Sequence, residues 1–132
     1  MKIRAYSAAD EAKLFELMRD EGEGWSCYFA DEQIGKYKLA LENSRTYVAY
    51  EGDTLCGFMR CRDDDGFGVY IYDLLVKKEF RGRSIGRILM ETVCADCPED
   101  TVYVMSDVDE YYEKQGCRRV GSIFEVKTQR QV

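Results

Sequence analysis

The most informative stretch of this chain is residues 69–93, VYIYDLLVKKEFRGRSIGRILMETV. Residues 69–76 are rich in β-branched and aromatic side chains, which favour a strand. Residues 77–84 are polar or small apart from Phe80 and predict a loop. The following apolar residues recur at the spacing of a helix that packs one face on a sheet: Ile85, Ile88, Leu89, Thr92 and Val93. With a further strand over 101–105, this unit predicts a parallel, right-handed crossover.

Alternating and periodic patterns continue on both sides of this unit. The expected strands are 3–6, 46–50, 55–61, 69–76, 101–105 and 118–127, and a Gly52-Asp53 turn makes the second and third a hairpin. Helices are expected around Leu14 to Met18, around Ile34 to Leu41, over 85–95, and from 106 to a stop at Gly116. The order is therefore β-α-α-β-β-β-α-β-α-β. It predicts an α/β (α+β) fold in which helices flank one mixed sheet, and we expect a single domain over residues 1–132.

Composition excludes several classes of protein. Of the 132 residues, 45% are hydrophobic and 33% are charged, which is typical of a folded globular chain. No apolar run reaches the roughly 20 residues that span a bilayer, and residues 1–6 carry no signal-peptide core. We therefore expect a cytoplasmic protein with no membrane partner, either a monomer or a homodimer. The net charge of −6 argues against binding to a nucleic-acid backbone.

The chain has no histidine, which excludes Ser-His-Asp and Cys-His nucleophiles and most catalytic zinc sites. Among its six cysteines, Cys94 and Cys97 have C-x-x-C spacing. A zinc site would need a second such pair or histidines, and a redox pair would begin a helix, whereas this pair ends one, just before Pro98. We expect free thiols and no metal.

The loop over residues 77–87 is strongly basic in an acidic chain. It holds five cations against one acid, with small residues at 82, 84 and 86 that let a ligand approach the backbone. The free N–H groups at the start of the next helix add to an anion site that suits a pyrophosphate. The alternative is a solvated basic turn.

Three segments together resemble the GNAT acyltransferase superfamily. RGRSIG over 81–86 resembles its R/Q-x-x-G-x-G/A loop, YIYDLLV over 70–76 its fourth strand, and YYEKQG over 111–116 its late F-Y-E-K-x-G element. The order of elements also matches, so the resemblance covers nearly the whole chain. Ser84 departs from the usual glycine, and Cys117 replaces a common aromatic residue.

The resemblance implies an N-acetyltransferase that passes the acetyl group of acetyl-CoA to a primary amine of a small molecule or peptide by direct attack. In the family, the loop amides hold the CoA pyrophosphate and the fourth strand pairs with pantetheine. A non-catalytic acyl-CoA-binding or protein-interaction module is the alternative. The expected cofactor-binding residues are Leu74, Leu75, Val76, Arg81, Gly82, Arg83, Ser84, Ile85, Gly86 and Arg87.

Two residues are candidates for proton transfer. Asp73 alternates with Val69, Ile71 and Leu75, which places a carboxylate on an apolar face, and such burial needs a reason. It is either the general base or the partner of a cation such as Arg60, unless a bulge turns it away. Tyr112, placed by the resemblance, is the candidate acid for the departing thiolate, although a core tyrosine is the alternative.

The acceptor side is the least defined. The resemblance places it between the first two helices, where Trp25, Tyr28 and Phe29 lie, and Arg60 is a further candidate. These aromatic residues either stack on the acceptor or fill the core.

Overall fold

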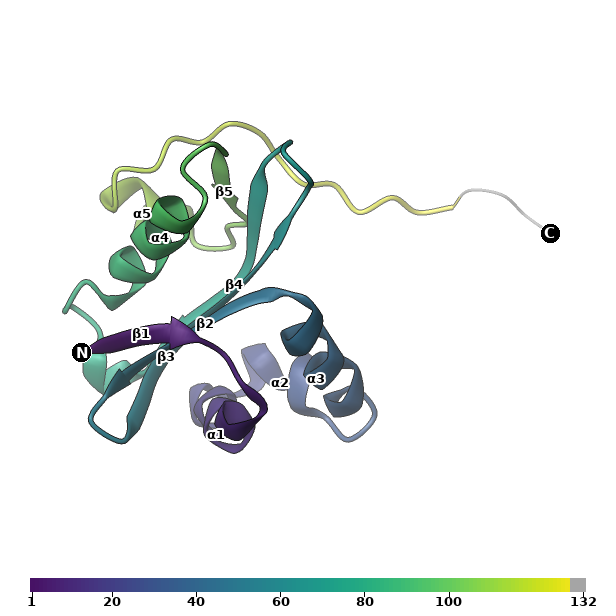
Figure 1. Ribbon diagram of the computed structural model, residues 1–132. Coiled ribbons are helices and arrows are strands. Elements are labelled where there is room, and N and C mark those ends of the chain that lie inside the picture. Colours follow the sequence, from purple (N-terminus) through teal and green to yellow (C-terminus); the bar gives the residue numbers. More distant parts are fainter. Residues whose placement is uncertain (129–132) are drawn as a thin grey trace.

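The computed structural model describes residues 1–128, whose centre is a five-stranded sheet in the order β1-β2-β3-β4-β5 (Figure 1). The first four strands pair antiparallel in sequence, and β5 pairs parallel with β4. The mixed sheet is therefore the expected one, including the parallel crossover. The strands are β1 (Lys2–Ala5), β2 (Arg45–Glu51), β3 (Thr54–Asp63), β4 (Val69–Val76) and β5 (Val102–Val104).

Helices cover both faces of the sheet. One face carries the three helices that precede β2, and the other carries α4 and α5 (Figure 1). The short α2 is an addition to the expected order and holds part of the aromatic segment between the first two expected helices. The helices are α1 (Glu11–Glu21), α2 (Ser26–Phe29), α3 (Ile34–Asn43), α4 (Ile85–Asp96) and α5 (Asp109–Lys114).

Each face has its own apolar core. The apolar stripe of α4 buries Ile85, Leu89 and Val93 against the sheet, at 4%, 0% and 0% exposure. Burial of side chains of this size stabilises the fold by about 1.5–3 kcal/mol each. On the other face, α1 and α3 pack against residues of β2, β3 and β4, among them Phe58 and Leu75.

A β-bulge in β4 changes which residues share a face. Opposite β3, Arg60 pairs with Asp73 but Cys61 pairs with Ile71, so Tyr72 is an extra residue. Val69 and Ile71 consequently pack on the α4 side, whereas Leu75 packs on the α1 and α3 side. The expectation that Asp73 shares a face with Val69 and Ile71 is wrong, because the bulge reverses the alternation.

β4 extends well beyond its pairing with β5. The paired residues end at Ile71 and Val104, and the amide of Met105 donates to the Ile71 carbonyl over 2.9 Å. Along the edge that faces β5, no strand of residues 1–128 pairs with β4 from residue 72 to residue 76. β5 ends at Val104, so the last part of β4, next to the loop that leads into α4, has no strand partner on this side among residues 1–128.

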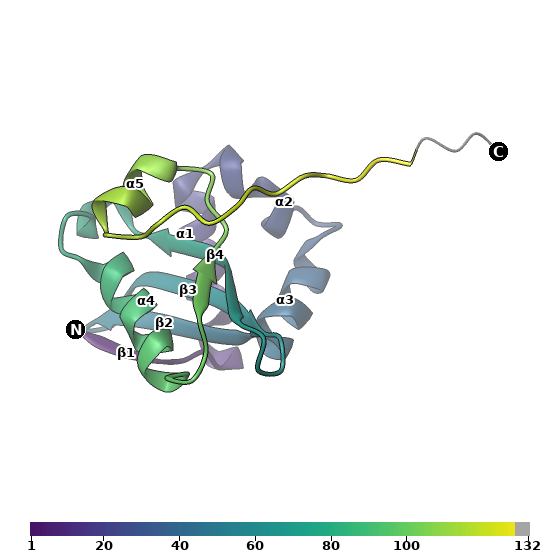
Figure 2. The same ribbon diagram turned by 90° about the horizontal axis from the view of Figure 1, so that it is seen from above.

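The last expected strand is wrong. Within residues 1–128, the segment after α5 forms no strand, and the observed order ends at α5. Residues 117–128 run away from the body of the protein (Figures 1 and 2). A strand needs an edge to pair with, and sequence pattern alone does not supply one. No helix among the described residues is both long and apolar enough to cross a membrane.

Candidate active site

The loop before α4 presents a row of unpaired amides. Gly82 and Ser84 have positive φ angles of 84° and 63°. Within residues 1–128, no amide N–H from residue 82 to residue 87 donates to a backbone carbonyl, whereas the amide of Ile88 donates to Ser84 over 2.9 Å. Three of these amides belong to the first turn of α4, where the N–H groups have no carbonyl partner within the helix. Such a row at a helix N-terminus binds anions well.

The cations of this loop differ in their use. Arg81 donates from Nε to the Val76 carbonyl over 3.0 Å and from Nη2 to Glu21 of α1 over 2.6 Å, so it anchors the loop. Lys77 pairs with Asp20 at 3.5 Å. Arg83 lies over the Phe80 ring at 4.9 Å and has no acidic partner among the described residues. The exposed Lys78 likewise has no acidic partner among the described residues, so Arg83 and Lys78 are the loop cations available to a bound anion.

Arg87 and Tyr111 hold α5 against the start of α4. The Arg87 guanidinium donates to the Gln115 carbonyl and pairs with Glu91 at 3.1 Å. The Tyr111 hydroxyl occupies the space next to Gly86 where a β-carbon would otherwise lie. Tyr111 therefore packs against α4, and a side chain at position 86 would collide with its hydroxyl.

Tyr112 lies in the same short helix, with its ring edge-on to that of Tyr111 at 5.0 Å. It is half-buried. Burial, and to a smaller extent the electrostatic effect of Tyr111, raises its pKa to about 12. The phenol therefore keeps its proton across the neutral range, as a general acid must.

Asp73 is 4% exposed and belongs to a buried polar cluster on the α1 and α3 side of the sheet. Its Oδ2 accepts hydrogen bonds from Arg60 Nε and from the Tyr37 hydroxyl, each over 2.6 Å. The ion pair with Arg60, one of the two possibilities left by the sequence, is therefore present. Both of these bonds end on Oδ2, and the Tyr28 hydroxyl also interacts with the carboxylate.

Aromatic rings surround this ion pair. The Arg60 guanidinium lies between the rings of Tyr37 and Tyr72, at 5.6 and 5.4 Å. Tyr28 packs 4.6 Å from Tyr37, and burial, together with the charge of Asp73, raises its pKa to about 12. Trp25 lies 5.5 Å from Tyr28 and so extends the cluster.

Phe29 contributes elsewhere. Its ring lies 5.9 Å from the Arg19 guanidinium of α1, and it packs on the second core. Among the expected acceptor residues, Trp25, Tyr28 and Arg60 therefore come together with Asp73, whereas Phe29 packs beside α1.

Sequence reasoning missed Tyr37, Tyr72 and the anchoring role of Glu21. Tyr37 lies within the helix expected around Ile34 to Leu41, and its hydroxyl bond to Asp73 spans 36 positions of sequence. Tyr72 joins the cluster because it is the bulged residue. A local signal existed only for Tyr37, as the one polar atom on an otherwise apolar helix face.

Comparison with known proteins defines the class. The model of the acetyltransferase (GNAT) family matches residues 11–117, which include every element from α1 to α5. The chain therefore belongs to the GNAT acetyltransferase family. Acyl transfer is the class of reaction that this family membership supports.

Two curated relatives are uncharacterised N-acetyltransferases. The chain is 26% identical over 121 residues to one from Pyropia yezoensis, covering 83% of this chain and 67% of that protein. It is 28% identical over 114 residues to one from Porphyra purpurea, covering 78% of this chain and 63% of that protein. The matched part thus spans about two thirds of their length.

Solved structures agree on the fold. A GNAT-family acetyltransferase from Streptococcus pneumoniae TIGR4 superposes with a TM-score of 0.71 at 21% identity, covering 96% of this chain and 98% of the other. An aminoglycoside 6'-N-acetyltransferase complexed with coenzyme A gives 0.73 at 18% identity, covering 92% and 87%. At these identities the likeness shows a shared fold.

Proposed function

We propose that this protein transfers the acetyl group of acetyl-CoA to a primary amine of a small molecule or peptide by direct attack. The observation that carries the proposal is the row of unpaired amides over residues 82–87. It lies beside the part of β4 that continues beyond its pairing with β5. Two phosphate groups fit such a row, with Arg83 and Lys78 as the available cations. The neighbouring solved structure with bound coenzyme A supports the same assignment.

The strand and α5 supply the groups for the chemistry. Backbone amides alternate along a strand, and the Lys77 amide donates to Cys56 of β3, so those of Leu74 and Val76 point away from β3. In this proposal they stabilise the negative charge that develops on the thioester oxygen. The acceptor amine attacks the thioester carbonyl carbon, a C–N bond forms and the C–S bond breaks. Tyr112 gives its phenolic proton to the departing thiolate, and the phenolate that remains, the stronger base of the two, takes a proton back from solvent.

We propose that the acceptor amine loses its proton on the face of the sheet that α1 and α3 cover. In this proposal Asp73 takes that proton at Oδ1, directly or through a water molecule, while Oδ2 stays fixed by Arg60 and Tyr37. Trp25, Tyr28 and Tyr72 provide aromatic faces that attract an ammonium group before it is deprotonated. We place this reaction in the cytoplasm, where the six free thiols stay reduced.

Turnover of acetyl-CoA against a panel of amines tests the proposal. Loss of the thioester should be followed directly, because thiol reagents would also react with the exposed thiols of Cys27 and Cys94. The panel contains small amines, polyamines, aminoglycosides and lysine peptides. Acetyl transfer that depends on one class of amine, and is reduced by Tyr112→Phe but not by Tyr103→Phe, supports the enzyme. Tyr103 stacks on Tyr70, outside the proposed machinery, and so controls for loss of a hydroxyl.

Ser84 favours a second candidate, the non-catalytic acyl-CoA-binding module. Its β-carbon stands in the amide row, at a left-handed φ of 63° where the family usually has glycine. Acetyl-CoA binding measured by calorimetry, with no transfer to any amine class, would support this module instead. Absence of binding would contradict both candidates.

A further inference from the structure

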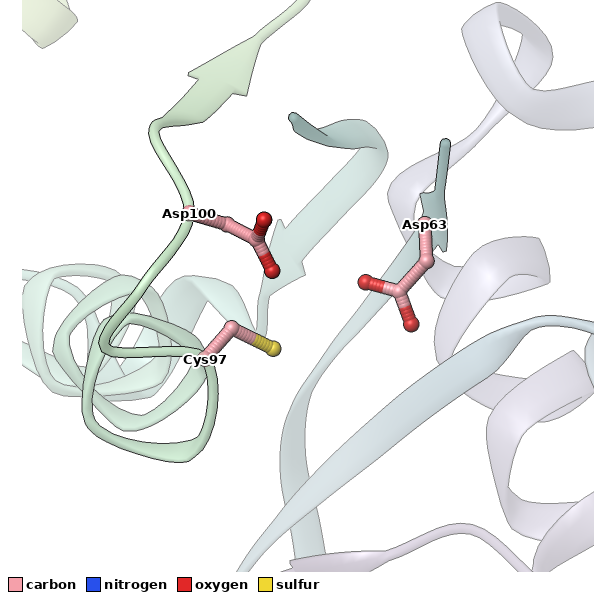
Figure 3. Close-up of side chains that lie close together, drawn as sticks. All are labelled: Asp63, Cys97 and Asp100. Atoms are coloured by element: carbon pink, nitrogen blue, oxygen red, sulfur yellow. The ribbon is translucent and has the colours of Figure 1, made fainter. Parts of the chain in front are cut away.

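Three potential metal ligands meet at the end of the sheet opposite the loop over residues 77–87. They are Asp63 at the end of β3, and Cys97 and Asp100 in the loop between α4 and β5. One carboxylate oxygen of each aspartate and the Cys97 Sγ all lie within 4.8 Å of one another (Figure 3). The residues come from two segments more than thirty positions apart, so the fold itself brings them together.

The Cys97 thiol is buried, and no group of residues 1–128 forms a hydrogen bond with it. Its residue is 6% exposed, and Sγ points into the gap between the two carboxylates (Figure 3). The other two buried thiols behave differently, because Cys56 donates to the Ala49 carbonyl over 3.3 Å and Cys61 to the Arg45 carbonyl over 3.2 Å. Among the described residues, Cys97 is thus the buried thiol without such a bond, and it faces ligand oxygens.

The surroundings carry excess negative charge. A cavity of about 360 Å³ adjoins the three residues, and Arg45 is the one cation among its lining residues. Arg45 Nη2 pairs with Asp63 Oδ2 at 3.2 Å, while no cation among residues 1–128 pairs with Asp100. The acidic residues lining the cavity are Asp63, Asp65, Asp96, Glu99 and Asp100.

We propose that Asp63, Cys97 and Asp100 bind a zinc ion. A thiolate beside two carboxylates selects a borderline-soft cation such as Zn²⁺ over Mg²⁺ or Ca²⁺, which prefer oxygen ligands alone. Three protein ligands leave a fourth, solvent position in a tetrahedral site. The three ionised ligands carry three negative charges, which a divalent cation and Arg45 together neutralise.

The geometry needs only a small closure. Ligand atoms around a tetrahedral zinc lie roughly 3.3–3.8 Å apart, so the side chains must approach by about 1 Å. Asp63 has 39% of its side chain exposed, and both of its hydrogen bonds from Arg45 go to Oδ2, so the movement has to carry or loosen this contact. The bound ion then ties the β3–β4 hairpin to the loop that enters β5. The site is independent of the acyl-transfer proposal, because none of its ligands belongs to that site.

Metal binding to the full chain tests the site. Protein freed of metal with a chelator is titrated with Zn²⁺ in competition with a chromogenic chelator, and in parallel with Co²⁺ to detect a thiolate-to-cobalt charge-transfer band. We expect one ion per chain, a band that reports one thiolate, and a higher thermal midpoint with zinc. Cys97→Ser should remove the band, and both Cys97→Ser and Asp100→Asn should weaken zinc binding at least tenfold.

Two matched controls separate this site from other ligands. Cys94→Ser changes the exposed thiol three residues earlier, and Asp65→Asn changes another acid that lines the cavity. Both should bind zinc as the wild type does. The proposal fails if no ion binds stoichiometrically, if Cys94→Ser loses as much affinity as Cys97→Ser, or if Asp100→Asn retains full affinity. Asp100 is partly exposed, so Asp100→Asn should fold, and its zinc affinity can be measured even if Cys97→Ser unfolds.

Discussion

The hydroxyl of Tyr111 fills the space that any side chain at Gly86 would need. Gly86 lies in the first turn of α4, and Tyr111 comes from α5, so this contact joins the proposed pyrophosphate loop to the helix that carries Tyr112. The glycine of the loop is therefore needed for helix packing as well as for access to the backbone.

Gly86→Ala should destabilise the protein by about 1–3 kcal/mol, because the new methyl group collides with the Tyr111 hydroxyl. Removing that hydroxyl with Tyr111→Phe should restore most of the loss, since the next ring atom lies 3.3 Å from the same point. Urea unfolding of the two single variants and the double variant measures the coupling. If Gly86→Ala lowers the free energy of unfolding equally in the wild type and in Tyr111→Phe, the contact is contradicted.

Ser84→Gly should stabilise the fold by up to about 1 kcal/mol. Ser84 has a left-handed φ of 63°, which costs a residue with a β-carbon roughly 1–2 kcal/mol, partly offset by the extra chain entropy of glycine. Ser84→Ala keeps the β-carbon and should give no such gain. We also expect Ser84→Gly to bind acetyl-CoA more tightly in calorimetry. A stabilised variant with unchanged affinity would place the Ser84 β-carbon away from the bound phosphates.

Arg60→Met should destabilise the protein by about 3–5 kcal/mol, because it leaves the buried Asp73 carboxylate without its cation. The Arg60 and Asp73 side chains are 14% and 3% exposed. The double variant Arg60→Met, Asp73→Asn should lose less than Arg60→Met alone. Denaturant unfolding decides, and additive losses would mean that the two side chains are not coupled.

The strand, loop and helix over residues 69–96 were predictable because each has a strong local signal. β4 spans the expected residues 69–76, and α4 covers the expected helix with one further residue. The bulge at Tyr72 was not predictable, because one extra residue is visible only in the pairing with β3. The same limit hid the partners of Asp73, which lie 13 and 36 positions away in sequence.

The loop cations show a related limit. Their number predicted an anion site, but sequence alone could not show which of them form ion pairs within the protein and which remain available to a ligand. Arg81 reaches Glu21 across 60 positions, whereas Arg83 keeps its charge available. Residues 118–127 were expected to form a strand because of their composition, yet pattern alone does not provide a sheet edge to pair with.

Tyr112→Phe should lower kcat about 10²–10⁴-fold, as expected for loss of a general acid, with little change in the affinity for acetyl-CoA. The pKa of Tyr112 is raised to about 12, so its protonated form persists through the neutral and mildly alkaline range. Deprotonation of this phenol should therefore cause no fall in wild-type kcat below about pH 10.

The same shift has a stability consequence that the phenylalanine variant isolates. A tyrosine whose pKa is higher in the folded state contributes stability below its unfolded value of about 10, and this contribution is lost as the pH rises towards 12. The stability of Tyr112→Phe should thus fall less steeply than that of the wild type as the pH rises above 10. A variant with unchanged kcat, or with acetyl-CoA binding lost in parallel, would make Tyr112 a structural or cofactor-contacting residue instead of the acid.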